Sequence, residues 1–241
     1  MEVNKIYNEN CLETMAKMPN KFIDLTVTSP PYNMNLRIRN GKYCSRQIVK
    51  EFSSKYDSFD DNLPIDEFYE LHSKILRELL RVSNIVFYNV QIVTGSKRAF
   101  FKLIGEFNEE LKDIIIWDKV NGQPAMQDCV LNSQNELILI FGDNAISRQF
   151  TKCNFKRGEL SNTWAIKRGK KIDKNHGAIF PEELIKKIIE NFSDKHDLIY
   201  DPFCGSGTTP KMAKQLDRNY IGSEISEEYC KVIAQRLNTL L

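Results

Sequence analysis

The run Asp201-Pro202-Phe203-Cys204-Gly205-Ser206-Gly207-Thr208-Thr209 decides the fold of this chain. The three residues before it, Leu-Ile-Tyr at 198–200, are apolar and predict a short buried strand. The glycines let the backbone approach a ligand closely, and the segment from Thr208 opens a helix with a proline in its first turn. The spacing fits neither the dinucleotide fingerprint nor a phosphate loop, which needs Gly-Lys-Ser/Thr. We therefore expect a strand, a ligand-binding turn and a helix.

A second short strand downstream of this turn ends in an acid. Residues 219–224 read Asn-Tyr-Ile-Gly-Ser-Glu, and a helix is expected over 227–240. In nucleotide-binding α/β folds an acid at the end of the second strand accepts hydrogen bonds from ribose hydroxyls. The alternative for Glu224 is a solvated acid at a helix start. With the glycine turn, the segment predicts one nucleoside-binding half of a doubly wound fold.

A different loop, Thr28-Ser29-Pro30-Pro31-Tyr32-Asn33, follows the apolar, strand-like residues 22–27. Its two prolines fix the backbone and remove two amide donors, which leaves carbonyl groups as rigid acceptors. Ser29 adds a hydroxyl and Tyr32 a flat ring, so the loop suits a planar group that carries an amine. A plain proline-rich turn is the alternative. Because ligands of open parallel sheets bind outside the carboxyl ends of the strands, we expect both loops to line one cleft.

Together the two loops resemble those of the beta-group amino-methylating DNA methyltransferases of the Ser-Pro-Pro-Tyr type. The catalytic motif of that family is Asp/Asn/Ser-Pro-Pro-Tyr/Phe, and its cofactor loop commonly reads Asp-Pro-Phe-x-Gly-Ser-Gly-Thr-Thr. The catalytic motif comes first here, which is the order of the beta group. Residues 175–184 are similar to the family's His-x-Ala-x-Phe-Pro segment. Residues 8–13 are similar to its Gly-Asp-Cys-Leu-Glu element, with Asn10 where aspartate is usual.

This resemblance implies a fold, a cofactor and a set of site residues. The implied fold is a single α/β domain over 1–241, doubly wound, with a mostly parallel sheet of seven strands, one of which is antiparallel. The implied methyl donor is S-adenosylmethionine, which leaves as S-adenosylhomocysteine, and the substrate is double-stranded DNA. The implied catalytic residues are Ser29, Pro30, Pro31 and Tyr32. The implied cofactor-binding residues are Asp201, Pro202, Phe203, Gly205, Gly207, Thr208, Glu224, His176, Phe180, Pro181, Asn10 and Cys11.

The remainder of the chain alternates between helical and strand-like patterns, which is typical of a parallel sheet with helices on both faces. The expected helices cover 65–82, 97–107 and 181–192, and the expected strands cover 84–90, 113–117 and 136–141.

Positive charge gathers in two segments, although the net charge is only +2. Residues 33–56 carry six basic side chains against one acidic, and residues 145–175 carry nine against two. Such clusters are the footprint of a phosphate-binding surface, and two solvated loops are the alternative. We expect a mobile DNA-contact loop at 33–62 and an inserted target-recognition segment at 145–175. The candidate DNA contacts are Arg37, Arg39, Lys42, Arg46, Arg148, Lys156, Arg157, Lys167, Arg168, Lys170 and Lys171.

The composition argues against a membrane protein, a secreted protein and a zinc protein. No run of 18 apolar residues occurs and the N-terminus does not resemble a signal peptide, so no membrane association is expected. The six cysteines and three histidines show no zinc spacing, which favours reduced thiols, no metal site and a cytoplasmic location. The resemblance also suggests a restriction-modification system with a cognate restriction endonuclease as partner, and a homodimer is left open.

The motifs predict a mechanism. A base inside a duplex cannot be reached, so the target must be flipped out, with Tyr32 stacking on it. Ser29 Oγ and the Pro30 carbonyl would accept hydrogen bonds from the amine, more strongly as charge develops there. A carbon-5 cytosine methylase would need a Pro-Cys thiolate, and no cysteine follows a proline here.

Serine at the first position of the catalytic loop favours, by resemblance, N4 of cytosine over N6 of adenine. Two other functions are weighed against a DNA amino-methyltransferase: a methyltransferase acting on RNA or a protein amide, and an inactive DNA-binding subunit.

Overall fold

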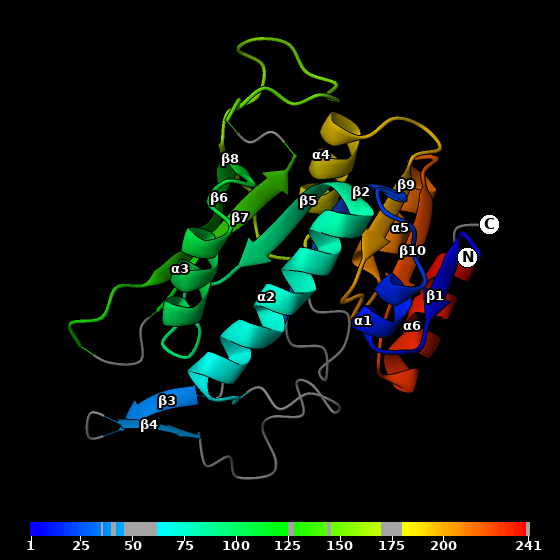
Figure 1. Cartoon of the computed structure of the whole chain (residues 1–241). Helices are drawn as coiled ribbons and strands as arrows, with labels where there is room; N and C mark the ends of the chain where they lie inside the picture. Colours follow the sequence, from blue (N-terminus) through cyan, green and yellow to red (C-terminus); the bar gives the residue numbers. More distant parts are fainter. Residues whose placement is uncertain are drawn as a thin grey trace.

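The chain folds around one mixed sheet (Figure 1). The computed structural model describes residues 1–34, 36–39, 42–45, 62–124, 128–143, 146–169 and 180–239. Within these residues the sheet has eight strands, and β7 alone runs against the others. Their order across the sheet is β1 (Lys5–Tyr7), β10 (Asn219–Ser223), β9 (Leu198–Asp201), β2 (Ile23–Thr28), β5 (Ser83–Val90), β7 (Ser133–Gly142), β6 (Leu111–Gln123) and β8 (Thr163–Ala165).

Helices cover both faces of the sheet because successive strand residues point to opposite sides. Val86 and Tyr88 lie in one buried core and Phe87 lies in the other. The first core also holds side chains from α1 (Cys11–Ala16), α2 (Ile65–Val82) and α3 (Lys97–Glu106). The second holds side chains from α4 (Glu182–Phe192), α5 (Thr208–Gln215) and α6 (Glu227–Asn238). The doubly wound α/β fold expected from the sequence is therefore confirmed.

The strand count and a few elements differ from the sequence-based expectation. The eighth strand, β8, is a three-residue piece of the 145–175 segment that pairs in parallel with β6. The short elements β1 and α1 were also not expected, because three to six residues carry too little periodicity to be recognised. Within 33–62, β3 (Leu36–Arg39) and β4 (Lys42–Ser45) form an antiparallel hairpin. By contrast, α2 has the predicted limits 65–82.

The position of the cleft follows from the strand order. β2 and β9 are neighbours in the middle of the sheet, with Leu25 opposite Ile199. From β9 the sheet continues to β10 on one side, and from β2 it continues to β5 on the other. Loops that leave neighbouring strands in opposite directions open a crevice at their carboxyl ends. We call this end of the sheet the cleft edge and the opposite end the far edge; the cleft edge is at the bottom of Figure 1.

No helix in the described ranges combines the length and the hydrophobicity that a bilayer crossing requires.

Candidate active site

The two loops singled out in the sequence line one cavity of about 410 Å³ at the cleft edge. The catalytic loop contributes Ser29, Pro31 and Tyr32, and Pro30 is buried beside them. The glycine loop contributes Asp201 and its successors through Ser206, together with Thr208. The expectation of a single cleft shared by both loops is confirmed.

Asp201 joins the two loops. Its carboxylate accepts a hydrogen bond from the Thr28 hydroxyl, 2.8 Å away, and another from the backbone N–H of Phe203 at 3.1 Å. Only 3% of the residue is exposed, and this burial raises the pKa of Asp201 to about 6. Thr28 immediately precedes Ser29, so this side chain fixes the start of the catalytic loop against the glycine loop.

The glycine loop turns where only glycine fits comfortably. Gly205 and Gly207 have φ of 50° and 78°, in the left-handed region. A Cβ on Gly207 would lie 2.8 Å from Cγ1 of Ile233, so the packing of α6 leaves no room for a side chain at this position. Gly207 is the residue immediately before α5. Gly205 lines the cavity, whereas Gly207, also predicted as a cofactor contact, is not among the lining residues.

Glu224 closes the turn from the next strand. It follows β10, and its carboxylate accepts hydrogen bonds from the N–H of Gly205 at 2.8 Å and of Ser226 at 2.9 Å. The side chain lines the cavity, and burial raises its pKa. Each carboxylate oxygen has two acceptor directions, so Glu224 keeps capacity for a ligand hydroxyl while it shapes the loop.

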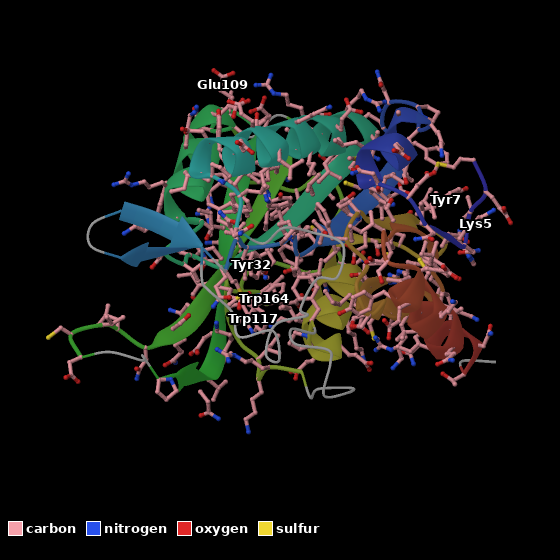
Figure 2. All side chains as sticks on the ribbon, turned by 90° about the horizontal axis from the view of Figure 1, so that it is seen from below. Lys5, Tyr7, Tyr32, Glu109, Trp117 and Trp164 are labelled. Carbon is pink, nitrogen blue, oxygen red and sulfur yellow. The ribbon has the colours of Figure 1, made fainter. Side chains whose placement is uncertain are left out.

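The catalytic loop is anchored by hydrogen bonds to two other segments of the chain. Asn33 has φ of 57° and donates hydrogen bonds to the carbonyls of Leu63 at 2.8 Å and Gly95 at 3.0 Å. The hydroxyls of Ser29 and Tyr32 are hydrogen-bonded to each other. Tyr32 is 6% exposed and borders the cavity, as does Trp117; Figure 2, which views the molecule from the cleft edge, shows both near its centre. The loop thus presents its hydroxyls in a fixed arrangement.

Three polar residues of this site were missed in the sequence. Asn89 is the penultimate residue of β5 and donates to the Tyr32 hydroxyl at 2.6 Å and to Glu136 of β7 at 2.7 Å. Glu136 also accepts from Lys119 of β6 at 3.1 Å. In the sequence, Asn89 and Glu136 are each a polar residue near one end of an otherwise apolar strand. Only the strand order shows that both of these ends lie at the cleft.

The remaining predicted cofactor residues fall into two places. Asn10 caps α1 by accepting from the N–H of Leu12 at 2.9 Å, and it lines the cavity beside Cys11. Burial raises the pKa of the Cys11 thiol to about 12, so it stays protonated. Phe180 also lines the cavity, and Pro181 precedes α4. His176 lies outside the described residues.

The basic residues of 145–175 separate into two groups. Arg148 pairs with Asp113 at 2.7 Å, near the start of β6, which lies at the far edge. Lys156 and Arg157 are exposed in the same connection, which lies at the top of Figure 1, away from the cleft. The structure therefore does not bring these three side chains to the cleft.

The second group reaches the cleft because β8 runs parallel to β6. Lys167 and Arg168 follow β8 and are exposed, and Arg168 lines the cavity with Gly169. For the other candidates, the side chains of Arg37, Arg39 and Lys42 and the whole of Arg46, Lys170 and Lys171 lie outside the described part.

Over most of its length the chain is similar to known proteins. The sequence profile of the DNA methylase family of N6 and N4 methyltransferases matches residues 23–236. The type II methyltransferase M.BglII of Bacillus subtilis is 26% identical over 98% of this chain and 69% of its own length. The solved PvuII DNA methyltransferase (cytosine-N4-specific) has a TM-score of 0.69 at 18% identity, over 96% of this chain and 85% of that one. The solved M1.HpyAVI–SAM complex has a TM-score of 0.65 at 21% identity, over 97% and 99%.

Proposed function

Because the chain belongs to the N6/N4 family of DNA methylases, we propose that it methylates the exocyclic N4 of a flipped-out cytosine in DNA. Enzymes of this family use S-adenosylmethionine as the methyl donor. The observation that carries the proposal is the one cavity that contains both the paired hydroxyls of Ser29 and Tyr32 and the acids Asp201 and Glu224.

The residues of the glycine side fit S-adenosylmethionine. Phe203, Ile225 and Tyr229 give the cavity apolar surface for an adenine ring, and Glu224 offers acceptor capacity for ribose hydroxyls. The positive φ of Gly205 leaves open space where a side chain would stand, so backbone can meet a ligand there. When bound at this place, the cofactor would supply an electrophilic methyl group next to the catalytic loop.

The catalytic loop supplies what the amine needs. The lone pair of an exocyclic amine is conjugated with its ring, and attack on a methyl group requires it to rehybridise and gain positive charge. The Pro30 carbonyl and Ser29 Oγ accept the amine protons and bind them more tightly as this charge develops. The Tyr32 ring holds the base by stacking. No cysteine stands in the catalytic loop, so these groups act without a covalent enzyme intermediate.

Two features support cytosine over adenine. The first position of the loop is the neutral Ser29. The PvuII enzyme, which shares the fold, is named as specific for N4 of cytosine. The name of M.BglII as a type II methyltransferase supports a place in a restriction-modification system, with a cognate endonuclease as partner. A homodimer and a cytoplasmic location stay predictions.

The test is transfer of a radiolabelled methyl group by the purified chain to DNA, RNA and protein, followed by digestion of the labelled DNA to nucleosides. The proposal expects label in DNA alone, in N4-methyldeoxycytidine. Label only in RNA or protein would overturn the function, and N6-methyldeoxyadenosine would overturn the choice of base.

A further inference from the structure

A line of hydrogen bonds crosses four neighbouring strands behind the catalytic loop. It begins at Lys119 on β6, passes through Glu136 on β7 and Asn89 on β5, and reaches Tyr32 after β2. The distances are 3.1, 2.7 and 2.6 Å, and the Tyr32 hydroxyl is bonded in turn to Ser29 Oγ. A buried charge pair is thereby connected to the Ser29 hydroxyl, to which the proposed function assigns the substrate amine.

The ion pair between Lys119 and Glu136, at one end of this line, is not explained by a contribution to folding stability. The side chains of Lys119 and Glu136 are 1% and 11% exposed. Removing two charges from water costs about as much as their attraction returns, so an apolar pair of similar volume would serve a core as well. An ion pair placed at the border of an active cavity therefore points to a role in that cavity.

The orientation of Asn89 depends on Glu136. A carboxylate can only accept hydrogen bonds, so it must face the amide nitrogen of Asn89. The same nitrogen directs its second proton to the Tyr32 hydroxyl at 2.6 Å, with a longer contact of 3.4 Å to Ser29 Oγ. In this orientation Asn89 Oδ1 is buried and has no partner within the described residues. Turning the amide over would place Oδ1 against the carboxylate, so Glu136 holds it in an arrangement that leaves an acceptor unsatisfied.

We propose that Glu136, itself fixed by Lys119, is a positioning residue that sets the direction of the hydroxyl protons of Tyr32 and Ser29. Since the Tyr32 oxygen accepts from Asn89, its own proton is directed to Ser29 Oγ. The Ser29 proton is then turned toward the cavity. There it meets the unprotonated ring nitrogen that stands beside the amine in cytosine, while the Pro30 carbonyl and the remaining Ser29 lone pair accept the amine protons.

This role rests on the proposed methyl transfer and is tested within it. Glu136→Gln keeps the shape but can donate to Asn89 Oδ1, so the amide turns over and Tyr32 then donates to Asn89. We expect kcat to fall about tenfold or more, the equivalent of one misdirected hydrogen bond, with KM for S-adenosylmethionine within about twofold. Lys119→Met combined with Glu136→Leu removes both charges and leaves no acceptor to hold the amide nitrogen of Asn89, so the same loss of kcat is expected from this variant if the single variant folds poorly.

A double-mutant cycle separates positioning from general damage. If Glu136 acts through the Tyr32 hydroxyl, adding Glu136→Gln to Tyr32→Phe should lower kcat no further. Glu106→Gln is the matched control, because Glu106 accepts from Tyr69 at 2.6 Å and Ser73 at 2.9 Å and is not part of the cavity lining. It should keep wild-type kcat.

Three outcomes would overturn the proposal. Wild-type kcat in folded Glu136→Gln, or in the double variant with Lys119→Met, excludes the positioning role. Losses that multiply in the cycle show that Glu136 acts independently of Tyr32. Absence of methyl transfer by the wild-type chain overturns the proposed function as well, which distinguishes that failure from the other two.

Discussion

The hydroxyl of Thr28 donates a 2.8 Å hydrogen bond to the buried carboxylate of Asp201. The two residues are at the ends of neighbouring strands, β2 and β9, and each begins one of the loops that line the cavity. This bond fixes the distance between the proposed cofactor site and the catalytic loop. In-line transfer requires such fixed placement of the reacting groups.

The ionised form of Asp201 should lower the free energy of unfolding, so the stability of the protein should depend on pH. Its pKa is raised from 3.8 to about 6 by burial, so the folded chain binds this proton more tightly than the unfolded chain. The stability from this group is fully present below about pH 4 and is lost as the pH rises through 6, by about 3 kcal/mol. Asp201→Asn keeps an acceptor for Thr28 without this loss. Relative to wild type, its free energy of unfolding in urea should increase between pH 4.5 and pH 7.5.

The control for this titration is Asp217→Asn. Asp217 is an exposed acid that pairs with Lys195 at 2.8 Å, and its pKa is lowered by that lysine. Its variant should show no such increase. An Asp201→Asn difference that is independent of pH would mean that Asp201 is not the titrating group.

Two substitutions should separate the contribution of the Tyr32 ring from that of its hydroxyl. Tyr32→Phe keeps the stacking surface but loses the bonds to Ser29 and Asn89, whereas Tyr32→Ala loses both. Methyl transfer should therefore decrease in Tyr32→Phe and decrease much further in Tyr32→Ala. Steady-state kcat with a DNA substrate measures this order, and equal activities of the two variants would exclude stacking.

Glu224 should determine cofactor affinity. Glu224→Ala removes the acceptor for ribose hydroxyls and leaves the Gly205 amide unpaired, which should weaken S-adenosylmethionine binding by about 1–3 kcal/mol. Glu227→Ala is the control, because this nearby acid is exposed and forms its ion pair with Lys231 on the outer surface of α6. Calorimetry that finds the same affinity in both variants would reassign Glu224 to a structural role.

The two groups of basic residues should behave differently toward DNA. Neutralising Lys167 and Arg168, which follow β8 at the cleft edge, should weaken DNA binding and reduce the salt slope by about 0.9 for each phosphate that is no longer neutralised. Neutralising Lys156 and Arg157 removes the same charge from the far-edge connection and should leave the slope nearly unchanged. Equal changes in the two pairs would show that charge alone matters and position does not.

Much of this architecture was predictable because the strands and helices carry strong local patterns. The apolar positions of 65–82 repeat at helical spacing, and α2 has those limits. The two loops were predictable as neighbours because strand ends of a parallel sheet share one edge, and the cavity confirms it.

The rest depended on strand order, which local patterns do not contain. Lys119 meets Glu136, and Glu136 meets Asn89, only because β6, β7 and β5 lie side by side. Likewise, Arg148 and Arg168 are both basic and belong to one segment, yet β8 places them at opposite edges of the sheet. Charge counts cannot distinguish such positions.

The most direct test of the account is mass spectrometry of nucleosides from the DNA of cells that express the wild-type chain or Ser29→Ala. Loss of one polar stabiliser of the developing charge costs about 2.7–4 kcal/mol, a rate decrease of about 10² to 10³. The account predicts N4-methyldeoxycytidine with the wild-type chain and almost none with Ser29→Ala at equal expression. Wild-type levels of the methylated nucleoside in Ser29→Ala, or 5-methyldeoxycytidine as the product, would contradict it.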